Sequence, residues 1–238
     1  MQTYAKLLSF TSLLALVSGH AQILSAVGES GTAVGFDVDT SLARNCTTIN
    51  PCQLDATIIR DAEINANIVG VCGRTEQNAN IDVAQREEDA ISANAVTQIQ
   101  AGTKVAVTLH QVNADGAGPF ACDLVSADNG VIASNLTVEN NVPGANGFSQ
   151  AKAVDFNMTV IMPDTITGCT DSTQGNVCAV RCRNNAQAGP FGGCFAVQNT
   201  DAAATASSGS NSKSSKSASA KSSKNSNNNK KRSMRFFS

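Results

Sequence analysis

Eight cysteines constrain the fold of this chain more than any other feature of its sequence. They are Cys46, Cys52, Cys72, Cys122, Cys169, Cys178, Cys182 and Cys194. An even number of cysteines in a secreted chain is typical of a disulfide framework, although the spacing alone does not assign the partners. Zinc is the weaker alternative, because Cys178 and Cys182 have no second pair at zinc-finger spacing. We therefore predict a fold stapled by up to four disulfides.

Residues 1–19 are typical of a secretory signal peptide. An apolar run over residues 7–17 ends close to Val17 and Gly19, which are small residues at the −3 and −1 positions of a cut before His20. A cut two residues later, before Gln22, also satisfies the small-residue rule. The run is too short to cross a bilayer, which takes about 20 apolar residues, and no later segment approaches that length. We expect a secreted protein, extracellular or cell-wall associated, without a transmembrane segment.

Three N-glycosylation sequences agree with secretion. Asn45, Asn135 and Asn157 each begin an Asn-x-Thr pattern. The pattern bears on location and says nothing about function.

Charge and composition divide the rest of the chain into a domain at residues 20–202 and a tail at residues 203–238. All 19 acidic residues lie at or before Asp201, whereas eight of the 17 Lys and Arg lie in the tail. The tail is rich in Ser, Asn and Lys without apolar periodicity, so we predict that it is disordered. It is either a solvated linker or a cationic anchor for an anionic polymer or membrane, and Lys231-Arg232 resembles a dibasic processing site.

The domain shows mostly a period of two in its hydrophobic pattern. In the segment Val105 to His110 apolar residues alternate with others, and the segment 154–162 alternates similarly. Shorter strands are predicted at Ile23 to Val27, Ala33 to Val38 and Cys194 to Val197, and a short helix within Asp82 to Ile99. Glycine-, Asn- and Asp-rich turns separate the strands. The pattern favours an all-β, antiparallel β-sandwich.

The chain has only two histidines, and the signal cut would put one of them at the N-terminus. An N-terminal His20 offers its α-amine and its imidazole as nitrogen ligands, and the imidazole of His110 would supply a third. Three nitrogens with an open position suit tetragonal Cu(II). The alternatives are that His110 hydrogen-bonds the following loop and that His20 is an accident of the cleavage site.

Four sequence features resemble a known family. They are His20-Ala21-Gln22-Ile23 after the signal, the strand ending at His110, Gly116-Ala117-Gly118-Pro119, and Gly189-Pro190-Phe191-Gly192-Gly193-Cys194. Together they resemble the fungal Egh/MAS family of appressorium-associated secreted virulence proteins over residues 20–202. The chain is more distantly similar to lytic polysaccharide monooxygenases.

The resemblance implies an immunoglobulin-like (fibronectin III-like) sandwich that holds one copper per chain in a histidine brace made by His20 and His110. By the same resemblance, Phe191 would lie on the copper axis, with Phe195 as the alternative, and Gln187 would support the ligands. The implied activity is oxidative cleavage of a cell-wall polysaccharide, of host or fungus, by a monomer that uses an external reductant with O2 or H2O2.

The composition narrows these expectations. Trp is absent, and the single Tyr lies in the signal, so the mature protein has no flat Tyr or Trp surface for crystalline cellulose or chitin. No serine-hydrolase elbow or phosphate-binding glycine loop occurs, and nucleic-acid binding is not expected. Arg181 and Arg183 are candidates for contacts to sugar hydroxyls, for support of the copper ligands, or for pairs with the acidic surface. The alternative function is a non-enzymatic virulence, copper-binding or carbohydrate-binding protein of the same fold.

Overall fold

A computed structural model describes residues 20–126, 130–169 and 176–201. The predicted signal peptide, the basic tail and the Lys231-Arg232 site lie outside these ranges.

Within the described ranges the chain forms nine strands and little helix. The strands are β1 (Ala21–Val27), β2 (Thr57–Ile58), β3 (Thr97–Ile99), β4 (Lys104–Gln111), β5 (Ala121–Val125), β6 (Ile132–Glu139), β7 (Val154–Ile161), β8 (Val177–Arg183) and β9 (Phe191–Asn199). The helices are α1 (Asp61–Asn65), α2 (Val83–Ser92) and the 3-10 turn Ala114–Gly116.

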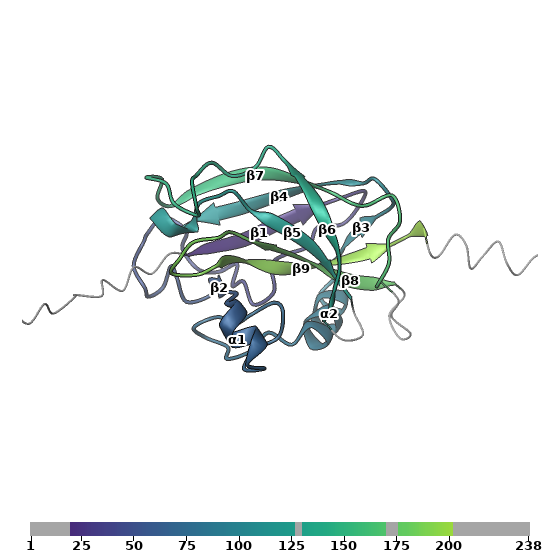
Figure 1. The fold of residues 1–238 in the computed structure, drawn as a ribbon, viewed down its shortest axis with the longest axis horizontal. Helices are drawn as coiled ribbons and strands as arrows, with labels where there is room; N and C mark the ends of the chain where they lie inside the picture. Colours follow the sequence, from purple (N-terminus) through teal and green to yellow (C-terminus); the bar gives the residue numbers. More distant parts are fainter. Residues whose placement is uncertain (1–19, 127–129, 170–175, 202–238) are drawn as a thin grey trace, which may run out of the picture.

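All nine strands belong to one sheet that folds over on itself. The order is β1-β4-β7-β6-β5-β8-β9-β2, with antiparallel neighbours, while β3 pairs with β9 in parallel. In Figure 1, β1, β4 and β7 form the upper layer, β8 and β9 lie beneath them, and α1 and α2 lie below β8 and β9. The prediction of an all-β antiparallel fold is confirmed as a nearly closed sheet; the immunoglobulin-like subclass stays a prediction.

The main core lies between the two layers. Val105, Val107 and Leu109 on β4 are fully buried, as their alternation predicts, and they join residues of β1, β7 and β9. Phe195 of β9 also points into this core. The alternation along β4 therefore fixes which face of the upper layer turns inward.

A second, smaller core lies on the opposite face of β9. Cys194 and Ala196 of β9 pack there with Ile81, Val83 and other apolar residues around α2. Because β8 and β9 are covered on both faces, nearly every residue in them is buried. This double burial removes the alternation on which a strand prediction depends.

The eight cysteines form four disulfides, as predicted. The pairs are Cys46–Cys52, Cys72–Cys194, Cys122–Cys182 and Cys169–Cys178. Cys122 and Cys182 lie directly opposite each other on β5 and β8. The second pair fastens the segment between the two helices to β9.

Two predicted elements differ in extent. Residues 33–38 contain isolated bridges at Ala33 and Gly35 instead of a strand, and Asp37 adopts a positive φ of 60°. The helix predicted within 82–99 is confirmed as α2, whose first turn is capped by the Asp82 carboxylate accepting from the Gln85 amide at 3.1 Å. It ends at Ser92 because Asn94 has a φ of 54°, and β3 follows.

Candidate functional site

The two histidines lie on adjacent strands. Gln22 of β1 is directly opposite His110 of β4. The Val112 amide donates to the His20 carbonyl at 3.0 Å, which extends the same register by one pair beyond β1. His20 and His110 are therefore diagonal neighbours on one face of the sheet, a relationship that places backbones about 7–8 Å apart.

His110 is oriented by a carboxylate from the next strand. Its Nδ1 lies 2.6 Å from Oδ1 of Asp155, the residue directly opposite it on β7. The imidazole is buried, whereas 55% of the Asp155 side chain is exposed. With a proton on Nδ1 directed at the carboxylate, Nε2 carries the free lone pair, and this buried atom has no hydrogen-bond partner among the described residues. A buried imidazole nitrogen of this kind is a good metal ligand.

His20 is enclosed by the loop that follows β4. Its backbone nitrogen donates to Oδ1 of Asn113 at 2.9 Å. A side chain at Gly116 would collide with the His20 carbonyl, so only glycine lets this loop approach. The Asn113 carboxamide therefore contacts His20, while Asp155 orients His110.

Phe191 is the aromatic residue beside the histidines. Its ring centroid lies 5.1 Å from that of His20, and the side chain is buried. Phe195 lies four residues further along β9 in the main core, opposite Val180. Gln187 is exposed in a turn, and none of the described hydrogen bonds joins its side chain to either histidine.

Asn184 fixes the position of Phe191. Its Oδ1 accepts from the Phe191 amide at 2.9 Å, and its Nδ2 donates to the carbonyls of Asp115 and Ala117 at 2.8 and 2.9 Å. The buried carboxamide thus ties the start of β9 to the loop that covers His20. Burial raises the pKa of the Asp115 carboxyl in this loop.

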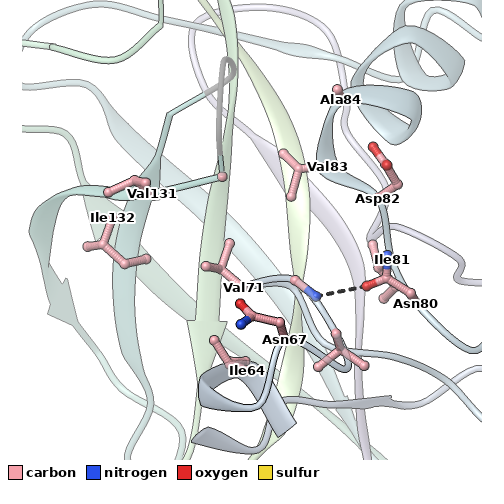
Figure 2. A pocket seen from close by; sticks show the side chains of 13 residues that line it. Ile64, Asn67, Val71, Asn80, Ile81, Asp82, Val83, Ala84, Val131 and Ile132 are labelled. Atoms are coloured by element: carbon pink, nitrogen blue, oxygen red, sulfur yellow. Dashed lines mark hydrogen bonds between the residues drawn. The ribbon is translucent and has the colours of Figure 1, made fainter.

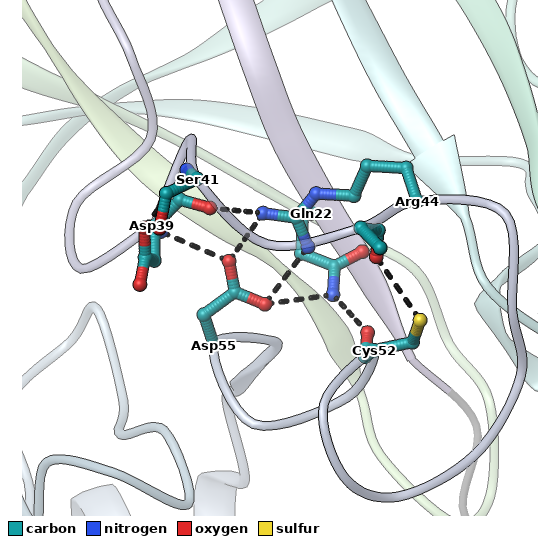
Figure 3. Close-up of polar contacts among 7 residues, drawn as sticks. Gln22, Asp39, Ser41, Arg44, Cys52 and Asp55 are labelled. Carbon is teal, nitrogen blue, oxygen red and sulfur yellow. Dashed lines mark hydrogen bonds and ion pairs between the residues drawn. The ribbon is translucent and has the colours of Figure 1, made fainter.

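A buried polar network supports β1 at the residue opposite His110 (Figure 3). The Gln22 amide donates to the Cys52 carbonyl at 3.0 Å and to Asp55 at 3.1 Å. Arg44 donates to both carboxylate oxygens of Asp55, at 2.9 and 2.5 Å, and to the Asp39 carbonyl at 2.8 Å. The network holds the disulfide-closed loop of Cys46–Cys52 against the strand that carries His20.

Asp155 and Asn184 were missed from the sequence as site residues. Asp155 belongs to an outward position of a strand that was predicted, but its pairing with His110 depends on the register of two strands 45 residues apart. Asn184 falls in an irregular segment after β8 whose sequence has no distinctive pattern.

One cavity lies away from the histidines. It has a volume of about 670 Å³ and lies between α1, the start of α2 and the start of β6. Figure 2 shows its aliphatic lining, including Ile64, Val71 and Val131, and the hydrogen bond from the Gly70 amide to Asn80. Among the described residues that line it, the only ionisable one is Asp82, which caps α2. The described part of the lining therefore holds no cluster of catalytic side chains.

Among the described residues, no three His, Cys, Asp or Glu side chains are grouped so that they could hold a metal ion. The predicted copper site uses only two side chains, and its third ligand is an α-amine. No helix in the described ranges has the length and apolarity needed to span a membrane. Asn45, Asn135 and Asn157 are all exposed, as glycosylation would require, and their modification stays a prediction.

Comparison with known proteins gives a consistent result. A sequence model of the Egh16-like virulence factor family matches residues 18–192. The chain is 36% identical over 187 residues to "Appressoria-specific virulence factor GAS1" of Pyricularia oryzae (strain 70-15), covering 77% of this chain and 73% of the relative. It is 30% identical over 251 residues to "Appressoria-specific virulence factor GAS2" of the same fungus, covering 79% and 86%. No solved structure matches.

Proposed function

The chain belongs to the Egh16-like virulence factor family, and on this premise we propose that it is a secreted virulence protein that binds one copper ion through His20 and His110. Its place of action would be the cell wall of a host or of the fungus itself. The named role of its relatives in virulence and their appressorial specificity support action during infection.

The observation that carries the proposal is the orientation of His110. Asp155 occupies Nδ1, and Nε2 is buried without a described hydrogen-bond partner. An unsatisfied buried polar atom costs about 1–3 kcal/mol, and a metal bound at Nε2 would remove that cost. Metal-binding histidines commonly donate their other ring nitrogen to a carboxylate, which matches this pair.

His20 fits the remaining two positions. A signal cut before His20 would convert its backbone nitrogen into an α-amine. The hydrogen bond to Asn113 uses only an N–H of that group, so an unprotonated amine keeps its lone pair for a metal. Two imidazoles and an amine form a neutral nitrogen set, which favours Cu(II) among the divalent ions.

Copper at this site would supply one-electron redox chemistry with O2 or H2O2 and an external reductant. The residues around it would bind and orient: Asp155 holds the His110 ring, Asn113 holds the N-terminus, and Phe191 gives an apolar wall without a hydroxyl ligand. We propose oxidative cleavage of a cell-wall polysaccharide as the reaction. A non-crystalline chain suits a surface without Trp or mature Tyr.

The test is a Cu(II) titration followed by electron paramagnetic resonance, on protein secreted with its own signal and stripped of metal. The proposal expects one nitrogen-rich copper per chain, loss of that signal in His110→Ala, and an N-terminus at His20 by mass spectrometry. Mature protein that begins at Gln22, or copper spectra unchanged in His110→Ala, would contradict it.

The reaction is tested separately from the metal. Reductant-dependent oxidised oligosaccharides that disappear in His110→Ala support an enzyme. Stoichiometric copper without turnover on β-glucan, chitin or pectin supports a non-enzymatic copper-binding virulence protein instead.

A further inference from the structure

We propose that a second cleft, at the end of β8, binds a short segment of a neutral polysaccharide. This inference deepens the proposed function, on which it rests for the relation between the cleft and the copper ligands. The cleft has a volume of about 370 Å³. That volume is at the small end of the range of ligand pockets, about 300–1,000 Å³.

The lining combines polar and apolar groups in the way that a sugar requires. Asp61, Arg183 and Asn185 offer hydrogen-bonding groups, and Pro119, Phe120 and Pro190 offer apolar surface. Sugars present hydroxyls around their edge and C–H groups on their faces. A pocket of few polar groups set among apolar ones recognises such a ligand by hydrogen bonds and contact together.

The charges of the cleft are paired. Arg183 Nη1 lies 2.5 Å from Asp61 Oδ1, and the two side chains are 24% and 66% exposed. This contact uses one of the five N–H donors of the guanidinium and leaves acceptor sites on the carboxylate. Adjacent hydroxyls of a sugar can therefore bond to donor and acceptor at once.

This pairing selects against acidic polymers. A uronate carboxylate that approached Arg183 would meet the Asp61 carboxylate at the same place, and like charges in contact repel. A site lined by cationic side chains alone favours an anionic ligand. A site in which the cation is paired with a carboxylate favours a neutral chain rich in hydroxyls. We therefore assign the cleft to a neutral glycan and not to pectate.

Asn185 supplies the accessible carboxamide. Its side chain is exposed, and its described contact is to Asn146 Oδ1 at 3.5 Å, at the outer limit of a hydrogen bond. The neighbouring Asn184 is buried and fully occupied by Phe191 and two carbonyls. Asn185 is thus free to contact a ligand, and Asn184 holds the wall.

The cleft and the histidine pair share that wall. Pro190 lines the cleft, and the next residue, Phe191, contacts the His20 ring at 5.1 Å between centroids. Asn184 bonds to the Phe191 amide and to the loop over His20. A glycan in the cleft would therefore lie beside the proposed copper ligands and anchor the chain near them.

The experiment is calorimetric titration of metal-free secreted protein with soluble hexamers of β-1,4-glucose, β-1,3-glucose, β-1,4-N-acetylglucosamine and galacturonic acid. We expect binding of at least one neutral hexamer and no binding of the galacturonic acid hexamer.

The variants test the residues of the cleft. Arg183→Ala should weaken the affinity for the neutral hexamer about tenfold, as for loss of one charge-assisted hydrogen bond. The exposed Asn185→Ala should weaken it several-fold. Lys104→Ala removes an exposed cation at the start of β4 that pairs with Glu139 and does not line the cleft, so this variant should bind as the unaltered protein does.

Three results would overturn the proposal: no neutral hexamer binds, Arg183→Ala and Asn185→Ala both bind normally, or the galacturonic acid hexamer binds as tightly as the neutral ones. His110→Ala separates this proposal from the copper proposal. It should lose copper and keep hexamer binding. In the unaltered protein, stoichiometric copper without hexamer binding counts against the cleft alone, and hexamer binding without stoichiometric copper counts against the copper site alone.

Discussion

The Asp155 carboxylate lies 2.6 Å from Nδ1 of His110, directly across the β4–β7 pair, and it determines which ring nitrogen carries the proton. Without this carboxylate either ring nitrogen could carry the proton, and the ring could rotate. The pair thus joins an exposed residue to a buried one in a single oriented unit.

Asp155→Asn should weaken Cu(II) binding by about 10–100-fold, the usual effect of altering a partner that orients a metal-binding histidine. The carboxamide can still accept from Nδ1, but it lacks the charge that raises the basicity of the ring. A competition titration with a copper chelator measures the change. Asp164→Asn, an exposed acid three positions beyond β7, is the matched control and should bind copper normally. Equal affinity in Asp155→Asn would mean that this carboxylate has no part in metal binding.

A second prediction concerns the network behind Gln22. Asp55 is fully buried and accepts from Arg44, from Gln22 and from the Asp39 amide. Asp55→Ala leaves the Arg44 guanidinium without its counter-charge, so the free energy of unfolding should fall by about 3–5 kcal/mol. Urea unfolding at neutral pH measures this loss.

The control for that variant is Asp39→Ala. The Asp39 carboxylate is exposed and bonds locally to Ser41, which lowers its pKa, whereas Arg44 uses only the Asp39 carbonyl. Removing the carboxylate should leave the urea midpoint nearly unchanged. If Asp39→Ala and Asp55→Ala were equally destabilising, the loss would arise from the loop and not from the buried ion pair.

The sequence analysis predicts β4 and β7, whose two faces differ, but it misses β6, although burial alternates along β6 as well. Val105 to His110 is an alternating strand, because one face of β4 packs on the core and the other faces away from it. β8 is buried on both faces, and β5 nearly so, so neither gives a period, and both were missed. The even number of cysteines predicts disulfides, but the partners follow only from the folded strands, as in Cys122–Cys182.

The candidate site, like the fold, was predictable only in part. His20 and His110 follow from rarity and position, and Phe191 follows from the family resemblance. Asp155 does not, because the pairing of β4 with β7 is a tertiary fact that strand periodicity leaves open.

The disulfides should contribute unequally to stability. Cys72–Cys194 joins residues 122 positions apart, whereas Cys46–Cys52 joins residues six apart. In the chain-entropy description a loop of about 100 residues is worth roughly 4.7 kcal/mol, and shorter loops are worth less. Replacing both members of the first pair by Ala should therefore lower the free energy of unfolding more than replacing both members of the second. Urea unfolding of the two double variants decides this, and an equal loss would show that closing the longer loop adds no more stability than closing the shorter one.

The last prediction is an acid dependence that arises from Glu63. Hydrogen bonds from Arg74, with added attraction from Arg74 and Arg60, hold the pKa of the Glu63 carboxyl below its ordinary value of 4.5. A carboxyl with a lower pKa in the folded state stabilises the fold above its unfolded pKa, and this contribution is lost as the pH falls through the folded value. The free energy of unfolding should thus decrease as the pH falls below about 4.5. Glu63→Gln should remove part of this pH dependence. Near neutral pH the same variant should be about 1 kcal/mol less stable than the unaltered protein. Urea unfolding between pH 3 and pH 7 measures both effects, with Glu88→Gln, an exposed acid on α2, as the control that should keep the unaltered slope. An unchanged slope in Glu63→Gln would assign the acid sensitivity to other carboxylates.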